Sequence, residues 1–307
     1  MRTVRTVADV RDACGGWRTA GGIVGLVPTM GAFHDGHRSL MKAARAECDR
    51  VVVSLFVNPT QFAPNEDLAA YPRDPEGDRA LAESIGVDLL FAPTFEEMYP
   101  EPGRTTVHVA GLTARLCGAD RPTHFDGVTT VVTKLFSITG PCRAYFGRKD
   151  AQQLAVVRRM TRDLDLPVEV IGCPLVRDPD GLAMSSRNAH LSVEERGSAL
   201  DLFRSLRAGV DAVEAGMRDP VTLGEIVAAE IGGESSIRPE YVEVVDPTTL
   251  EPRTQLNGVT LVAVAARVGP ARLIDNMTLE VHGDTVTADL GVTAGAGRYV
   301  PVAGIAP

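Results

Sequence analysis

The sequence predicts an α/β protein in which a Rossmann-like parallel sheet is followed by a smaller α+β domain. Its first half alternates short apolar runs with stretches of helical composition, and the runs expected to form strands span residues 23–27, 51–57, 88–91, 144–146 and 168–171. Helices are expected between them over residues 36–47, 75–85, 126–138 and 150–162. This alternation is typical of parallel strands joined by right-handed crossovers. The run at 51–57 is almost wholly apolar, as in a strand buried on both faces.

The pattern changes after Pro174. A long helix is predicted over residues 192–216, with Ser192 as its N-cap, and the later segments are a helix over 221–231 and strands over 241–245, 259–265 and 272–281. Helices followed by antiparallel strands indicate a small second domain of the α+β class. We therefore predict a Rossmann-like domain over residues 1–175, a C-terminal α+β lid domain over 176–283 and a flexible tail over 284–307.

Composition narrows the class of protein. The chain has 307 residues and a formal net charge of −9, which argues against a nucleic-acid partner. No apolar run approaches the ~20 residues of a membrane helix, and the first residues lack the pattern of a signal peptide. The five cysteines include no C-x-x-C pair, so neither a zinc site nor a disulfide framework is indicated. A cytoplasmic protein without membrane or nucleic-acid partners is expected.

The segment from Pro28 to His37 lies between the first predicted strand and the first long helix. A helix N-terminus there offers free N–H groups to an anion, and Gly36 lets the backbone approach it closely. His34 and His37 are three residues apart and share one helical face, so both can donate to phosphate oxygens. A pair of capping or surface histidines is the alternative. Zinc is disfavoured because the pair lacks the i,i+4 spacing and glutamate of the zincin motif.

Two amides follow the strand at 51–57. Asn58 and Gln61 lie where ligands of open parallel sheets bind, beyond the carboxyl ends of the strands. Amides can hydrogen-bond both a hydroxyl and a carboxylate. Asn58 before Pro59 is also common turn chemistry, whereas Gln61 is poor turn material and favours binding.

Two polar segments later in the chain complete the pattern. Residues 147–153 follow a strand and open a helix, which places Lys149 where a phosphate is favoured and Gln153 on the same side as Asp150. Residues 184–188 follow a strong turn signal at 178–181 and supply two hydroxyls and a guanidinium. Each alone could be a solvated polar loop. Together with the histidine pair, they could hold ATP from both sides.

These segments together resemble the pantothenate synthetase family. The resemblance extends over about residues 20–280 and is carried by residues 27–32, 34–37, 57–59, 61–62, 71–73, 121–125, 147, 149–150, 152–153 and 181–188. It implies a nucleotidyltransferase fold and a homodimer. It also implies a ligase that forms a C–N bond between pantoate and β-alanine, using ATP and Mg²⁺ and releasing AMP and pyrophosphate through a pantoyl-adenylate.

The resemblance also implies roles for individual residues. ATP would be bound by Met30, His34, Gly36, His37, Gly147, Lys149, Asp150, Val176, Met184, Ser185, Ser186 and Arg187. Pantoate would be bound by Pro28, Thr29, Met30, Asn58, Gln61 and Gln153. His34, His37, Lys149 and Arg187 are the expected catalytic groups. The magnesium ligands are not assigned, and Asp78 is a candidate only because it is acidic and follows the segment 71–73.

The chain departs from the family pattern at Cys117 and Arg148, where glutamate is usual, at Ala151, where an aromatic residue is usual, and in the tail after 283. The three substitutions motivate one alternative, a non-catalytic nucleotide-binding protein. The other alternative is a nucleotidyltransferase that keeps the nucleotide on its product. A phosphate acceptor would want more arginine or lysine than the site's amides supply, so the ligase is favoured.

Overall fold

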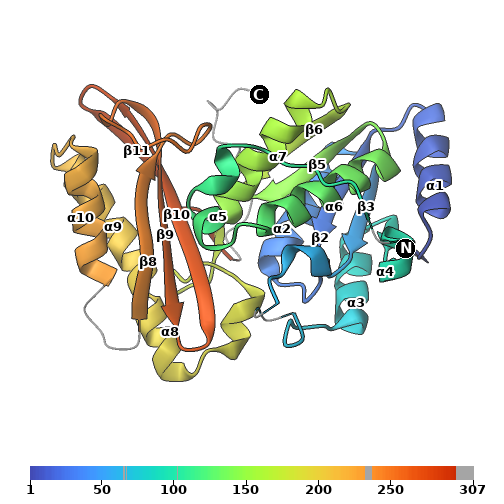
Figure 1. Ribbon diagram of the computed structural model, residues 1–307, viewed down its shortest axis with the longest axis horizontal. Helices are drawn as coiled ribbons and strands as arrows, with labels where there is room; N and C mark the ends of the chain where they lie inside the picture. The colour runs from blue at the N-terminus through green and yellow to red at the C-terminus, as the bar shows by residue number, and fades with distance from the viewer. Residues whose placement is uncertain (65, 67, 102, 232–236, 295–307) are drawn as a thin grey trace.

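The computed structural model describes residues 1–64, 66, 68–101, 103–231 and 237–294. Its N-terminal half is built on a six-stranded parallel sheet in the order β1-β4-β3-β2-β5-β6 (Figure 1). The strands are β1 (Arg2–Val4), β2 (Val24–Thr29), β3 (Arg50–Leu55), β4 (Leu89–Phe91), β5 (Cys142–Gly147) and β6 (Val168–Cys173). The predicted Rossmann-like α/β sheet is confirmed.

Helices cover both faces of this sheet. One face packs against α1 (Val7–Thr19), α6 (His124–Thr139) and α7 (Ala151–Asp163), and the other against α2 (Asp35–Glu47) and α3 (Pro75–Ile85). Alternate residues of a strand enter different cores: Val52 packs on the α6 side, while Val51 and Val53 pack on the α2 side. Burial on both faces explains why the strands read as continuous apolar runs. The connecting segments contain the short helices α4 (Phe95–Met98) and α5 (Cys117–Asp120).

The second half forms an antiparallel sheet in the order β11-β10-β9-β8. Its strands are β8 (Ile237–Val245), β9 (Gly258–Val268), β10 (Ala271–His282) and β11 (Thr285–Asp289). The helices α9 (Asp201–Glu214) and α10 (Pro220–Ile231) pack on its outer face, whereas Leu261 and Ala263 on the inner face join the core of the parallel sheet (Figure 1). The predicted α+β character of this half is confirmed.

One local prediction needs correction, and two elements were missed. The first strand β1 and helix α1 were not predicted. The single helix expected over 192–216 is divided into α8 (Val193–Ala199) and α9, because Leu200 donates to the Gly197 carbonyl three residues back and tightens the turn. Ser192 caps α8 as expected, in a reciprocal capping box with Glu195.

The prediction of a flexible tail over 284–307 is wrong for residues 285–293. Residues Thr285–Asp289 form β11, which pairs with β10, and β12 (Val292–Thr293) pairs in parallel with β7 (Val176–Arg177). These edge strands are held mainly by backbone hydrogen bonds, which need no apolar alternation and so leave little trace in the sequence. Residues 295–307 lie outside the described part of the chain.

A buried ion pair joins β7, the short strand that follows the parallel sheet, to β10 of the antiparallel sheet. Arg177 of β7 donates to both carboxylate oxygens of Asp275 of β10 at 2.6 and 2.8 Å, and each residue is 3% exposed. The guanidinium also donates to the Gly181 carbonyl and lies over the ring of Phe203. Because the pair is buried and bidentate, removing one partner would leave an uncompensated charge inside the protein.

Asp275→Ala should therefore lower the free energy of unfolding by roughly 3–5 kcal/mol, measured by urea denaturation. Asp211→Ala is the matched control, because Asp211 forms an exposed helical pair with Arg207 and its loss should cost under about 1 kcal/mol. Equal, small losses in both variants would show that the buried pair contributes little to the stability of the fold.

Candidate active site

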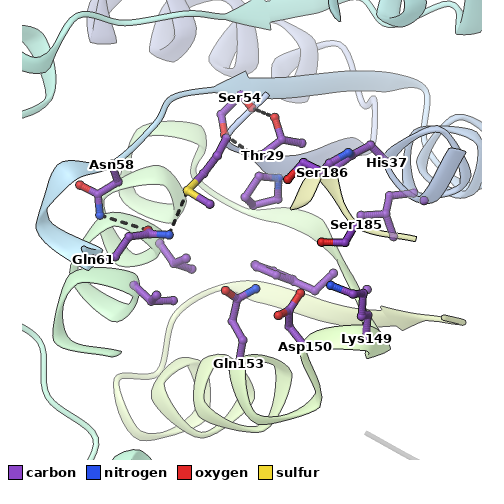
Figure 2. Close-up of a pocket in the computed structure, with 18 of the residues that line it drawn as sticks. Thr29, His37, Ser54, Asn58, Gln61, Lys149, Asp150, Gln153, Ser185 and Ser186 are labelled. Carbon is purple, nitrogen blue, oxygen red and sulfur yellow. Dashed lines mark hydrogen bonds between the residues drawn. The ribbon is translucent and has the colours of Figure 1, made fainter. Parts of the chain in front are cut away.

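One cavity of about 250 Å³ opens beyond the carboxyl ends of β2, β3 and β5. Every residue predicted above to bind ATP or pantoate lines this cavity. Figure 2 shows Asn58 and Gln61 at one end, with His37, Ser185, Ser186 and Lys149 toward the other. Segments far apart in the sequence meet here because the strands run parallel and their loops share one edge of the sheet.

The histidine pair forms the N-terminus of α2. His34 is the N-cap, and its Nδ1 accepts from the Gly36 N–H at 3.1 Å, while His37 Nδ1 lies 3.4 Å from the His34 N–H. The ring centroids are 4.2 Å apart. Since each Nδ1 accepts a backbone hydrogen bond, the neutral rings carry their proton on Nε2. The capping interpretation and the binding interpretation are thus compatible, because capping fixes the tautomer that can donate to a ligand.

Burial keeps both imidazoles neutral. Desolvation, followed by the nearby Lys149 ammonium, lowers the pKa of His34 to about 4. Desolvation also lowers the pKa of His37 to about 3, with His34 and Lys149 acting in the same direction. At pH 7 the pair therefore presents two N–H donors without adding positive charge.

Asp78 holds the turn that precedes this pair. Its carboxylate accepts from the backbone N–H of Ala32 at 2.9 Å and of Phe33 at 2.6 Å, and the residue is 2% exposed. Gly31 is required beside it, because φ is +94° and a Cβ would lie 2.9 Å from Asp78 Oδ2. The prediction of Asp78 as a magnesium ligand does not fit this geometry, since both oxygens are committed to the backbone.

The amide side chains of Asn58 and Gln61, at the other end of the cavity, differ in the hydrogen bonds that they make within the protein. Gln61 donates from Nε2 to the Met30 sulfur at 3.0 Å and accepts from Asn58 Nδ2 at 3.3 Å. Asn58 is 1% exposed, donates also to the Gly127 carbonyl, and accepts from the Tyr99 hydroxyl at 3.1 Å. Asn58 therefore orients Gln61, which together with Gln153 presents the amide groups facing the cavity (Figure 2).

Sequence reasoning missed several polar residues of the cavity wall, among them Arg121 and His124. Arg121 donates to both oxygens of Glu66, at 2.5 and 2.6 Å, and His124 Nδ1 lies 2.8 Å from the Gln61 carbonyl. Burial, together with the Arg121 charge, lowers the pKa of His124 to about 4, so its Nδ1 donates as a neutral ring. Both residues lie in the segment 121–125 that carried part of the resemblance, and this could have identified them.

An apolar wall was missed as well. One side of α6 supplies the buried residues Val128, Val131, Val132 and Leu135 to the cavity lining. The periodicity predicted the helix but could not indicate which of its apolar residues face a ligand rather than the core.

The cationic end is built from two loops. Lys149 lies in the turn between β5 and α7, and Asn276 of β10 fixes that turn by donating to the Arg148 and Lys149 carbonyls at 3.0 and 2.8 Å. In the second loop, Ser185 Oγ accepts from the Arg187 N–H at 3.3 Å. Residues of both loops line the same end of the cavity (Figure 2).

A second cavity of about 350 Å³ shares Lys149, Asp150, Gln153 and Arg187 with the first. Two of the residues that depart from the family pattern line it. Cys117 lies 3.3 Å from the Tyr241 hydroxyl and 3.2 Å from Arg272 Nη1, and Ala151 lies at the start of α7. Both departures are therefore beside the predicted binding residues and not among them.

A family model described as pantoate-beta-alanine ligase matches residues 2–278. The chain belongs to this family. The curated pantothenate synthetase of Moorella thermoacetica is 52% identical over 282 residues, covering 92% of this chain and 100% of that protein. The pantothenate synthetase of Thermotoga neapolitana is 52% identical over 279 residues, covering 91% of this chain and 100% of that protein.

Solved structures of the same family share the fold. The pantothenate synthetase of Thermus thermophilus superimposes with a TM-score of 0.84 at 49% identity, covering 90% of this chain and 98% of that one. The pantoate-beta-alanine ligase of Francisella tularensis, solved in complex with beta-gamma ATP and beta-alanine, gives a TM-score of 0.74 at 32% identity, covering 90% and 97%. Within the described residues, no helix is long and apolar enough to cross a membrane.

The histidine pair predicts how stability responds to acid. In the folded protein both rings stay neutral down to about pH 4, whereas their pKa in the unfolded chain is near 6.5. The unfolded state therefore binds more protons between these values, so the stability present above pH 6.5 is lost as pH falls. His37→Gln should make the free energy of unfolding fall less steeply between pH 7 and pH 5, measured by urea denaturation.

His190→Gln, at an exposed position, is the control and should keep the wild-type slope. An unchanged slope in His37→Gln would mean that the His37 imidazole does not titrate as its burial requires.

Proposed function

We propose that this chain joins pantoate to β-alanine at the expense of ATP, through a pantoyl-adenylate, and releases AMP and pyrophosphate. The observation that carries the proposal is one cavity with two chemically different ends. One end presents amides and an apolar wall, and the other presents a lysine, an arginine, two serines and two neutral imidazole donors. Such a cavity can hold a small hydroxy-acid in contact with a nucleoside triphosphate.

The amide end suits pantoate. Gln61 and Gln153 can hydrogen-bond its hydroxyl and carboxylate groups, since each amide both donates and accepts. The apolar edge of α6, formed by Val128, Val131, Val132 and Leu135, can receive the geminal methyl groups. The Met30 sulfur accepts a hydrogen bond from Gln61 and so holds this amide in place.

The other end suits the phosphates of ATP. Lys149 supplies a point charge, and Arg187 can bind phosphate oxygens in a bidentate manner. His34 and His37 add Nε2–H donors at the N-terminus of α2, where the helix dipole also favours an anion.

In the first step, a carboxylate oxygen of pantoate attacks the α-phosphorus of ATP. A new P–O bond forms, the bond from the α-phosphorus to the bridging oxygen breaks, and pyrophosphate leaves with the electron pair. Negative charge grows on the phosphate oxygens in this step. In this proposal Lys149, Arg187 and the two imidazoles stabilise this charge, and such stabilisation is usually the largest single contribution to catalysis.

In the second step, the free amine of β-alanine attacks the carbonyl carbon of the adenylate. The C–O bond to AMP breaks, the C–N bond forms, and the proton of the amine leaves to water. The second cavity adjoins the amide end through Gln153 and provides a route for the amine. The mixed anhydride must be protected from water meanwhile, and the Met184–Arg187 loop covers the phosphate end.

The residues present fit a magnesium ion carried by ATP. Mg²⁺ usually takes phosphate oxygens and waters together with one or two carboxylates. Asp150 lines both cavities, and its side chain makes no capping hydrogen bond to α7, so it is the carboxylate that would hold the ion. When bound, Mg²⁺ neutralises the charge on the departing pyrophosphate.

A homodimer and a cytoplasmic location are further proposals, and membership of the family supports them. Size-exclusion chromatography with light scattering tests the dimer directly, because a particle of twice the chain mass of 32.7 kDa is expected.

The proposal is tested by measuring pyrophosphate release from the purified protein with ATP, Mg²⁺ and pantoate, with and without β-alanine. Sustained release that needs both substrates, with AMP and an amide as products, is expected. Release with the nucleotide retained on the product would favour the nucleotidyltransferase alternative. ATP binding without any release would favour a non-catalytic protein.

Lys149→Ala should lower the rate of pyrophosphate release by a factor of ~10²–10³, because removing one group that stabilises transition-state charge typically costs this much. The matched control is Lys42→Ala, which removes an exposed lysine of α2 and should leave the rate unchanged. A Lys149→Ala variant with wild-type turnover would contradict the role assigned to this residue.

A further inference from the structure

The family model ends at residue 278, yet the chain continues through β11 and β12 to the cationic end of the first cavity, where Lys149 and Arg187 lie. Arg148, one of the residues that depart from the family pattern, finds its partner there. Its Nη1 donates to Asp289 Oδ2 at 2.9 Å, and the two side chains are only 18% and 21% exposed. Arg148 lines neither cavity, so the ion pair secures the turn that carries Lys149.

The backbone after Asp289 runs beside β7, which belongs to the other wall of the first cavity. Val292 donates to the Leu175 carbonyl and Ala294 to the Arg177 carbonyl, both at 2.8 Å, which makes β12 a partner of β7. Leu175 and the neighbouring Val176 line the first cavity. Residues 289–294 therefore contact both walls of the cationic end, since Asp289 pairs with Arg148 beside Lys149 and β12 pairs with β7.

Further hydrogen bonds connect β7, through β10, to the turn that carries Lys149. Arg177 Nε donates to the Leu290 carbonyl, and the same guanidinium holds Asp275. The next residue, Asn276, donates to the Arg148 and Lys149 carbonyls. A displacement of residues 289–294 would therefore shift the turn that carries Lys149 in two ways. One is through the Asp289–Arg148 pair, and the other is through Arg177, Asp275 and Asn276.

Gly291 sets how closely the segment approaches. Its φ is +91°, and a Cβ there would lie 2.3 Å from the Leu175 carbonyl oxygen. Its N–H donates to Asp289 Oδ1 at 2.9 Å, which also orients the carboxylate for Arg148. Only glycine permits this contact without moving one of the two backbones.

We propose that residues 289–294, which we call the strap, are a positioning element that holds the β7 wall and the Lys149 turn at the separation needed to bind ATP. The strap contacts no substrate and acts through Arg148 and Arg177. The inference rests on the proposed function, in which these two walls bind the nucleotide.

Gly291→Ala tests the strap. The variant should weaken ATP binding, measured as Kd by isothermal titration calorimetry, by roughly tenfold, less than the ~100-fold that a 1 Å misplacement at a reacting centre can cost. The matched control is Gly216→Ala, because Gly216 has a similar φ of +103° but nothing lies within 4 Å of an added Cβ. If Gly291→Ala binds ATP as tightly as this control, the proposal is overturned, even where both variants lose thermal stability equally.

The charge-reversed pair separates positioning from general stability. Arg148→Asp and Asp289→Arg should each weaken ATP binding and lower the rate of pyrophosphate release, whereas the double variant should recover most of both. Asp284→Asn removes an exposed charge at the β10–β11 turn and should change neither. Single variants with wild-type Kd would overturn the proposal. Wild-type protein that binds ATP without pyrophosphate release would instead count against the proposed ligase activity, and the Kd comparison would still decide the role of the strap.

Discussion

The candidate site depends on how the turn between β2 and α2 is held. Asp78 accepts the N–H groups of Ala32 and Phe33, and this fixes the direction in which α2 begins. His34 and His37 then satisfy the first free N–H groups of the helix with their own ring nitrogens. One local constraint thus determines the position, the tautomer and, through burial, the neutral state of both imidazoles. A helix start that normally needs a serine or aspartate cap is combined here with a pair of hydrogen-bond donors.

The opposite side of the cavity is held by contacts between distant parts of the chain. Lys149 lies on a turn whose carbonyls are bound by Asn276 of the second sheet, and the loop of Ser185 and Arg187 follows directly after β7. The small antiparallel sheet therefore does more than cover the parallel one, because it determines where the cationic groups lie. Such preorganised charge needs little rearrangement as the reaction proceeds, which is why fixed groups stabilise a transition state better than mobile ones do.

Much of the fold and of the cavity could be predicted from the sequence, for physical reasons. Strands buried on both faces must be apolar, and loops that follow parallel strands must meet at one edge, so the histidine pair, Gln61 and Lys149 could be placed together. The roles of Asp78 and of Arg148 could not be predicted, because their partners lie 46 and 141 residues away. Nor could β12 be predicted, since its pairing uses the backbone and needs no characteristic side chains. Local patterns report burial and turns, whereas these contacts depend on which distant segments become neighbours.

The central claim is that a carboxylate oxygen becomes bonded to the α-phosphorus of ATP within this cavity. The most direct measurement follows pantoate labelled with ¹⁸O in its carboxylate through one turnover with ATP, Mg²⁺ and β-alanine, with the products analysed by mass spectrometry. The account predicts that one ¹⁸O appears in AMP, because the attacked phosphorus keeps that oxygen when the amine displaces it from carbon. Label found in inorganic phosphate, or AMP free of label despite amide formation, would contradict an adenylate intermediate.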